Sequence, residues 1–212
     1  MSRVRPPSIH DGSSSILPML DIAGAAVFAI SGALEAAGKR QNIVTFMFFA
    51  AITGVGGGTV RDLLISAPVF WMHNATPIAV CMACAVVVWF TPGRLWSERA
   101  VDWFDGLGIA AYGVFGAAKA IAYGIPLLPA ALMGVVSACM GGIFRDMLAG
   151  EPSIVIRPEV YVTAVALSSG SYVFLSAIGL NNTLAAGIAM VLGFSLRAIA
   201  IVRGTALPSY RK

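Results

Sequence analysis

The chain has 212 residues, of which 58% are apolar and only 11% are charged, against roughly a quarter charged in an ordinary soluble domain. A soluble protein of this length cannot bury so much apolar surface, whereas a bilayer can solvate it. The net charge of +4 is small, and no basic stripe with interleaved aromatic residues accompanies it, so nucleic-acid binding is not expected. Composition therefore predicts an integral membrane protein.

Seven stretches are apolar and long enough to cross the hydrocarbon core, which takes about 20 residues. In chain order they cover residues 16–37, 43–65, 74–91, 104–122, 126–149, 158–178 and 183–203. Residues 1–15 are polar and rich in serine, which indicates a tail. The first stretch resembles a cleavable leader, but Asp21 and Glu35 lie inside it and argue against cleavage.

The short connections predict the orientation of the chain, because Lys and Arg near the span ends gather on the cytoplasmic side. The basic residues on one side are Lys39, Arg40, Arg94, Arg99, Arg157, Arg203, Arg211 and Lys212. The other side has only Arg3 and Arg5, both in the tail. We therefore expect a multi-pass protein of the plasma (inner) membrane, with its N-terminus outside and its C-terminus in the cytoplasm.

The sequence matches itself after a shift of 84 positions, without a gap over about 48 residues. The shift superposes Asp21 on Asp105, and it superposes the segment Gly57–Asp62 on Gly141–Asp146, both of which read GGxxRD. This predicts a tail (1–15), a first three-helix repeat (16–91), a cytoplasmic connection (92–103), a second repeat (104–178), and a seventh helix with a C-terminal tail (179–212).

Each repeat contains three spans, so the second repeat enters the membrane from the opposite side. The predicted fold class is an all-α integral membrane protein with seven transmembrane helices, built from two inverted three-helix repeats and a seventh helix. Inverted repeats of this kind place a substrate or ion path near the midplane, where the two repeats meet.

Glycine clusters interrupt the second and fifth spans at symmetric positions. Glycine is a poor helix former, so these helices are expected to bend or break there and to offer freed carbonyl groups to a cation. The alternative is that the small residues allow two helices to cross closely. The expected pore-lining or hinge residues are Thr53, Gly56, Gly57, Gly58, Ser137, Gly141 and Gly142.

Charged residues inside the spans are costly unless they face a partner or a cavity. They are Asp21, Glu35, Arg61, Asp62, Asp105, Lys119, Arg145 and Asp146, and we consider electrostatic or gating roles for all of them. Ion pairing that joins the repeats is the alternative for the Arg-Asp motifs. Lys119 could snorkel to the interface or repel ions, and its position in the repeat is taken by Glu35 in the first copy. Asp21 and Asp105 suit the N-terminal ends of their helices, or could attract cations.

Motifs typical of enzymes and metal sites do not occur. Cys81 and Cys84 have CxxC spacing, but they lie in an apolar run without a second ligand pair, so they are expected to be packing residues. His10 and His73 are far apart, and there is no Walker A, HExxH or GxSxG motif. We therefore expect no enzyme activity, no metal site and no cofactor.

The duplicated GGxxRD motif, the seven spans and the outside N-terminus resemble the trimeric intracellular cation (TRIC) channels in their short bacterial form. The resemblance implies a homotrimer in membrane lipid, with a pore for monovalent cations, chiefly potassium, inside each subunit and bounded by the second and fifth helices. It also implies that Gly56–Gly58 and Gly141–Gly142 line or hinge the pore. Lys119 would correspond to a basic residue linked to lipid binding and gating in animal members.

Two other functions stay open on the residues alone. Inverted repeats with broken helices also suit a secondary transporter of a small amino acid such as glycine, and some relatives of this repeat are labelled glycine transporters. Few polar residues are spare near the midplane to bind an ammonium and a carboxylate, which favours the channel. A non-conducting scaffold that assembles through its small residues is the third possibility.

Overall fold

The computed structural model describes residues 16–96, 99–156 and 160–206, and these form seven α-helices and two short 3-10 helices. The elements in chain order are α1 (Ile16–Gly38), α2 (Ile43–Leu64), α3 (Thr76–Phe90), η1 (Gly93–Leu95), α4 (Ala100–Ala122), α5 (Leu127–Ala149), η2 (Ile154–Ile156), α6 (Val162–Ala177) and α7 (Asn182–Arg203). The predicted all-helical membrane fold with seven helices is confirmed.

Local sequence explains several helix ends. Asn42 and Asn181 precede α2 and α7, and each side chain accepts hydrogen bonds from backbone N–H groups of the first turn. Pro77 lies in the first turn of α3, where its missing N–H costs nothing, and Thr91 ends that helix in an extended conformation before Pro92.

The ends of α2 and α5 are built alike. Each is followed by a residue with left-handed backbone, Ser66 (φ 55°) after α2 and Gly150 (φ 68°) after α5, and these two positions are 84 residues apart. The next N–H reaches back to the corresponding carbonyl group in both, from Ala67 to Asp62 (2.8 Å) and from Glu151 to Asp146 (3.0 Å). The repeat therefore extends to the turns that close the glycine-containing helices.

Three helices differ in length from the predicted spans. α3 and α6 are shorter than expected, at 15 and 16 residues, which corresponds to about 22–24 Å of helix. α4 begins at Ala100 rather than at residue 104, because the Ala-Val-Asp-Trp segment before the apolar run is also helical, with Asp102 in the first turn. The predicted start of the sixth span, at residue 158, lies outside the described residues, and α6 itself begins at Val162.

By length and hydropathy, four of the described helices could each span a bilayer: α1 from Asp21, α2, α5 and α7. The helices α3 and α6 are apolar but shorter. α4 is as long as α5, and its charged residues Asp105 and Lys119 form ion pairs with α5 and α2.

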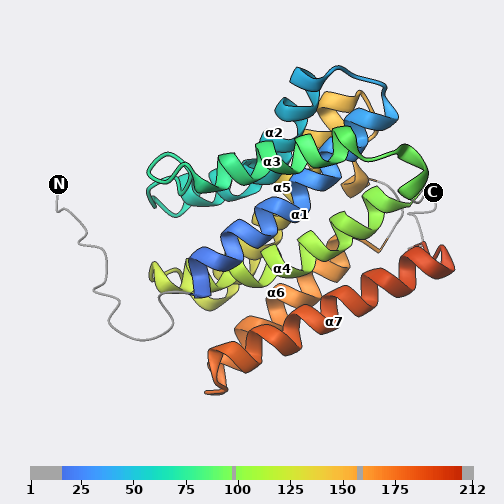
Figure 1. The fold of residues 1–212 in the computed structure, drawn as a ribbon. Helices are drawn as coiled ribbons and strands as arrows, with labels where there is room; N and C mark the ends of the chain where they lie inside the picture. The colour runs from blue at the N-terminus through green and yellow to red at the C-terminus, as the bar shows by residue number, and fades with distance from the viewer. Residues whose placement is uncertain (1–15, 97–98, 157–159, 207–212) are drawn as a thin grey trace.

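The two three-helix units, α1–α3 and α4–α6, pack against each other, and their equivalent helices run in opposite directions (Figure 1). α1 runs from left to right in this view, whereas α4 returns from right to left. α1 packs on α2, α3 and α4, while α4 packs on α5 and α6, and α2 packs on α5. The additional helix α7 covers α4 and α6. The four helices α1, α2, α4 and α5 therefore form the centre of the molecule.

An aromatic pair marks the pseudo-two-fold axis between the units. Phe28 and Tyr112, which are 84 positions apart, meet edge to face with ring centroids 5.4 Å apart. Each ring packs on a glycine of the opposite helix, Tyr112 on Gly24 and Phe28 on Gly108, and these glycines are also 84 positions apart. A side chain at either glycine would overlap the ring, so the small residues of the repeat allow the two units to interlock.

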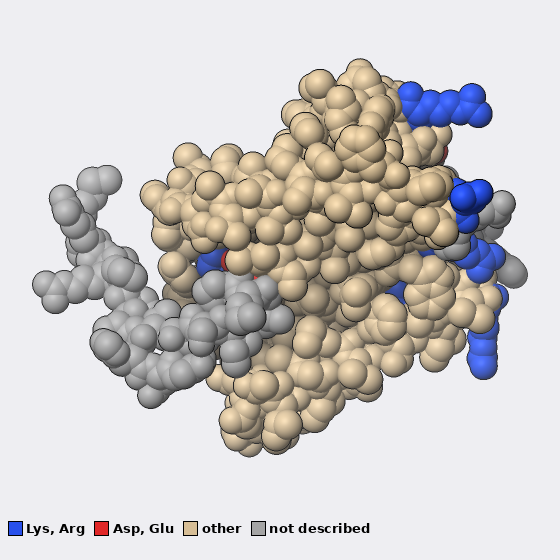
Figure 2. All heavy atoms as spheres, in the orientation of Figure 1, with Lys and Arg blue, Asp and Glu red and all other residues tan. Residues whose placement is uncertain are grey.

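Basic side chains gather at one end of the molecule, on the right in Figure 2. In the described part of the chain this end contains the α1–α2 connection, the α3–α4 connection and the end of α7, where Arg40, Arg94, Arg99 and Arg203 are exposed. Lys39 forms an ion pair with Glu151 after α5 at the same end, and this hydrogen bond raises the pKa of Lys39. The charge asymmetry expected from the connections is therefore present in three dimensions.

Candidate functional site

The glycine clusters bring α2 and α5 into backbone contact at the centre of the molecule. A β-carbon on Gly57 would overlap the carbonyl group of Ser137, and one on Gly141 would lie 2.7 Å from the carbonyl oxygen of Thr53. Gly57 and Gly141 are repeat equivalents, as are Thr53 and Ser137, so the crossing is symmetric. These glycines therefore fit the alternative interpretation from the sequence, in which small residues allow two helices to cross closely.

The prediction that the glycines break α2 and α5 is wrong for this structure. Both helices are continuous, over Ile43–Leu64 and over Leu127–Ala149. The carbonyl groups are therefore not freed, because close packing of two backbones supplies a contact that offsets the low helix propensity of glycine. Gly56 faces the ring of Phe144 and Gly58 faces the ring of Phe70, so the neighbouring glycines also serve packing.

Two hydroxyl groups at this crossing are buried and unsatisfied. Thr53 and Ser137 are fully buried, and neither side-chain oxygen has a hydrogen-bond partner among the described residues. A buried hydroxyl group without a partner costs about 1–3 kcal/mol. The crossing therefore carries a pair of polar groups that the closed packing leaves without a structural role.

The first Arg-Asp motif is the centre of a buried ionic cluster. Arg61 donates to Asp62 (Nε to Oδ1, 2.8 Å) and lies 3.4 Å from Asp21 of α1. Lys119 of α4 reaches the same Asp62 oxygen at 2.8 Å. The Arg61 guanidinium group also lies 4.7 Å from the centre of the Phe115 ring. We call these four charged residues the first cluster; in it two positive charges meet two negative charges.

The second Arg-Asp motif forms an equivalent cluster. Arg145 donates to Asp146 (Nη2 to Oδ1, 2.8 Å) and to Asp105 of α4 (Nη1 to Oδ1, 2.6 Å). It also donates to the hydroxyl group of Ser31 in α1 at 2.7 Å, and Ser31 occupies the repeat position of Phe115. We call Asp105, Arg145 and Asp146 the second cluster; all three are buried, and one positive charge meets two negative charges.

The outer oxygen of each motif aspartate is held in the same way. Asp62 Oδ2 accepts the N–H of Phe70 at 3.1 Å, and Asp146 Oδ2 accepts the N–H of Ile154 at 2.6 Å. Phe70 and Ile154 are again 84 positions apart. The aspartates thus fasten the segments that follow α2 and α5, which explains why the motif ends in Asp.

The structure brings most of the predicted charged residues together. Asp21 and Asp105 do not cap helix ends; each lies within its helix and pairs with the arginine of its own repeat. Glu35, which is half-buried in α1, is in neither cluster by any ion pair among the described residues, although it occupies the repeat position of Lys119. The Arg-Asp motifs pair mainly within their own repeats.

Several residues of the site were not predicted. Ser31, Tyr112 and Tyr161 are uncharged and lie in apolar runs, and their repeat counterparts Phe115, Phe28 and Pro77 are apolar too, so the sequence carried no signal for them. Arg197 carried a signal, because it is a charge inside the last span. It is buried in α7, and its guanidinium group lies 5.3 Å from the centre of the Tyr161 ring.

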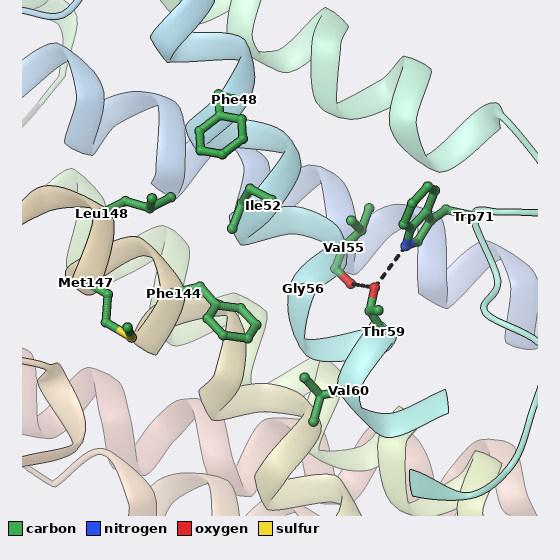
Figure 3. A pocket seen from close by; sticks show the side chains of 10 residues that line it. All are labelled: Phe48, Ile52, Val55, Gly56, Thr59, Val60, Trp71, Phe144, Met147 and Leu148. Carbon is green, nitrogen blue, oxygen red and sulfur yellow. Dashed lines mark hydrogen bonds between the residues drawn. The ribbon is translucent and has the colours of Figure 1, made fainter. Parts of the chain in front are cut away.

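An apolar groove of about 410 Å³ lies beside the crossing, on the outer side of α2 and α5 (Figure 3). Aliphatic and aromatic side chains line it, including Phe48, Ile52 and Phe144. Its polar groups are used internally, because Trp71 donates to Thr59 at 2.8 Å and Thr59 donates to the Val55 carbonyl at 2.7 Å. This surface suits an apolar environment and offers no ion ligands.

Comparison with known proteins gives the same duplicated architecture. The family described as glycine transporter matches the chain twice, over residues 18–92 and 102–177. A UPF0126 membrane protein of Vibrio cholerae is 35% identical over 177 residues, covering 81% of this chain and 73% of that protein. The UPF0126 inner membrane protein YadS of Escherichia coli K12 is 38% identical over 149 residues, covering 68% of this chain and 72% of YadS.

Solved structures extend the likeness to the whole fold. The TRIC trimeric intracellular cation channel orthologue from Rhodobacter sphaeroides is similar with a TM-score of 0.83 and 36% identity, over 90% of this chain and 100% of that one. A prokaryotic TRIC channel is similar with a TM-score of 0.81 and 25% identity, over 90% and 98%.

The chain therefore belongs to the UPF0126 (glycine transporter) family of multi-pass membrane proteins, and its structure matches those of prokaryotic TRIC channels. The predicted family resemblance is confirmed. The solved neighbours are channels rather than enzymes, in agreement with the expectation from the sequence.

Proposed function

We propose that the protein is a channel for monovalent cations, with potassium as the main ion and one pathway inside each subunit, between the two repeats. The main observation in support is that the charged residues of the two ionic clusters, all of them buried except the partly buried Lys119, lie around the crossing of α2 and α5, in a protein that is otherwise apolar. Buried charges inside a membrane protein typically mark an ion or substrate path. The likeness to the TRIC cation channel of Rhodobacter sphaeroides supports the same function.

The pathway runs past Thr53 and Ser137, with one ionic cluster on each side. The close contact between Gly57 and the Ser137 carbonyl group supports a closed point of the pathway at this crossing. Conduction requires α2 and α5 to separate or bend at their glycines, and the unsatisfied hydroxyl groups then face a passing ion instead of apolar packing. Lys119 contributes a positive charge to the first cluster, where it opposes cation entry.

The proposed setting is the inner membrane, with the N-terminus outside and the C-terminus in the cytoplasm. The basic end in Figure 2 supports this orientation under the positive-inside rule. The proposed assembly is a homotrimer in membrane lipid, by analogy with the trimeric neighbour. Cross-linking of the purified protein tests the assembly, since trimers should exceed dimers at saturation.

Single-channel recording tests the proposed function. Purified protein in a planar bilayer with a potassium gradient should give step-like currents that reverse near the potassium equilibrium potential. Folded protein that stays silent across all voltages would count against the channel.

The rival function is secondary transport of a small amino acid, which the description of the family as glycine transporter favours. Saturable uptake of labelled glycine into proteoliposomes, inhibited by unlabelled glycine and without unitary currents, would support it instead.

A further inference from the structure

The two ionic clusters differ by one positive charge. In the first cluster, Asp21 and Asp62 are balanced by Arg61 and by Lys119, whose ammonium group contacts Asp62 at 2.8 Å. In the second cluster, Asp105 and Asp146 share Arg145 alone among the ion pairs of the described residues. The repeat position of Lys119 is occupied by Glu35, a further acidic residue. The second cluster therefore lacks the cation that its equivalent contains.

Oxygen atoms without partners lie at the uncompensated carboxylate. Asp105 and Tyr161 are both fully buried. Neither Asp105 Oδ2 nor the Tyr161 hydroxyl group has a hydrogen bond of good geometry to any described residue, although the two side chains lie within hydrogen-bonding reach of each other. In contrast, both oxygens of Asp146 are used, by Arg145 and by the N–H of Ile154. The unsatisfied charge is thus localised at Asp105.

Gly142 has no side chain beside these two groups. A β-carbon at Gly142 would lie 3.0 Å from the Tyr161 hydroxyl oxygen and 3.5 Å from Asp105 Oδ1, with Ile154 at 3.8 Å. At the equivalent position in the first repeat, the Phe70 ring lies 2.7 Å from the same point on Gly58. In the second repeat the smaller Ile154 stays 3.8 Å from this point, and the Tyr161 hydroxyl group takes the place of the ring at 3.0 Å.

We infer, on the basis of the proposed function, that the Asp105 carboxylate and the Tyr161 hydroxyl group, beside the bare backbone of Gly142, bind a partly dehydrated monovalent cation, which supplies the charge that Lys119 supplies in the first cluster. Carboxylate and hydroxyl oxygens are suitable ligands for a hard cation. A single free carboxylate oxygen matches one positive charge. No group of three acidic, His or Cys side chains that could hold a metal ion occurs in residues 16–96, 99–156 and 160–206, which disfavours a divalent ion.

Arg197 is a nearby positive charge that does not fill this position. Its guanidinium group lies over the Tyr161 ring, 5.3 Å from the ring centre, the ion pairs of the described residues do not join it to Asp105, and it has interactions of its own. It therefore contacts the Tyr161 ring without pairing with Asp105.

Thermal unfolding of the purified protein tests the site without any measurement of current. The melting temperature is measured in detergent in KCl and in N-methyl-D-glucamine chloride at equal ionic strength, since a ligand that binds only the folded state raises it. We expect a saturable rise with K+, roughly 2–4 °C at several times the dissociation constant. The rise should be lost in Asp105→Asn and in Tyr161→Phe.

Asp21→Asn is the matched control, because it alters the equivalent carboxylate in the cluster that has its own ammonium group, and it should keep the K+ response. Lys119→Met should add a second K+-dependent rise, since it removes the tethered cation. Tyr161→Phe keeps every charge, so it remains informative if Asp105→Asn does not fold.

A wild-type melting temperature that does not respond to K+, or a response that persists in both Asp105→Asn and Tyr161→Phe, overturns the inference. The inference is also overturned if the melting temperature rises when the pH is lowered but not when K+ is added, because a proton would then neutralise Asp105. These results are independent of the bilayer recording. Protein that gives no current but keeps the K+-dependent rise in melting temperature refutes the channel and supports the site. Protein that conducts but lacks this rise supports the channel and refutes the site.

Discussion

Gly57 lies so close to the carbonyl group of Ser137 that no side chain fits between α2 and α5 at this point. Gly141 has the equivalent relationship to Thr53 on the other side of the pseudo-two-fold axis. The centre of the protein is therefore a contact between two backbones, which leaves no room for an added side chain.

Alanine at Gly57 or Gly141 should destabilise the fold, by about 1–3 kcal/mol, because the added methyl group meets a backbone carbonyl that has little room to move. The measurement is chemical or thermal unfolding in micelles. Gly170→Ala in α6 is the control: no atom lies within 4 Å of its β-carbon position, so higher helix propensity should stabilise by up to about 1 kcal/mol. Equal effects at the three positions would contradict a close crossing.

Removal of the unsatisfied hydroxyl groups should stabilise the protein while it impairs conduction. Thr53→Val and Ser137→Ala each eliminate a buried polar group without a partner, so a gain of up to about 1–2 kcal/mol is expected. Unitary current should fall if these oxygens face the ion. Ser168→Ala is the matched control, since that buried hydroxyl group donates to the Val165 carbonyl at 2.9 Å and its loss should destabilise. Unchanged current in both variants would place the pathway elsewhere.

Neutralisation of Lys119 should raise the cation current. Lys119→Met removes a positive charge beside Asp62, at a position that is only partly buried. The expected change is a larger unitary current, and a stronger increase in Lys119→Glu. Lys39→Met removes a lysine at the other end of the molecule, in an exposed ion pair, and should leave the unitary current near the wild-type value. A decrease in Lys119→Met would show that the ammonium group holds the pathway open.

The turn after α2 offers a stabilising substitution. Ser66 adopts the left-handed conformation (φ 55°) that Gly150 adopts at the equivalent turn after α5. Ser66→Gly should stabilise by about 1 kcal/mol, and Gly150→Ser should destabilise by a similar amount, because a β-carbon is unfavourable there. Thermal unfolding of the two variants checks both signs, and a loss of stability in Ser66→Gly would contradict the equivalence of the turns.

Sequence predicted the fold well because membrane spans and an internal repeat are both local signals. The shift of 84 positions gave the inverted units, and it correctly made Arg61 equivalent to Arg145 and Asp21 equivalent to Asp105. Sequence could not show that α2 and α5 stay helical at their glycines, because helix propensity describes an isolated helix and the contact between Gly57 and Ser137 is tertiary.

The composition of the clusters was also beyond the sequence. Asp21 appeared to suit a helix terminus, but its carboxylate lies beside Arg61, 40 residues away along the chain. Ser31 and Tyr161 carry no charge that would distinguish them from packing residues. Only the three-dimensional arrangement shows that one cluster has its full set of charges and the other does not.

The edge-to-face pair of Phe28 and Tyr112 carries an evolutionary consequence. Positions on a two-fold axis contact their own counterparts, so this geometry is that of an antiparallel homodimer whose two copies have been joined into one polypeptide. In a homodimer, any substitution changes both halves at once. Gene fusion removes that constraint. Equivalent positions can then hold different residues, as Glu35 and Lys119 do, and as Phe70 and Ile154 do.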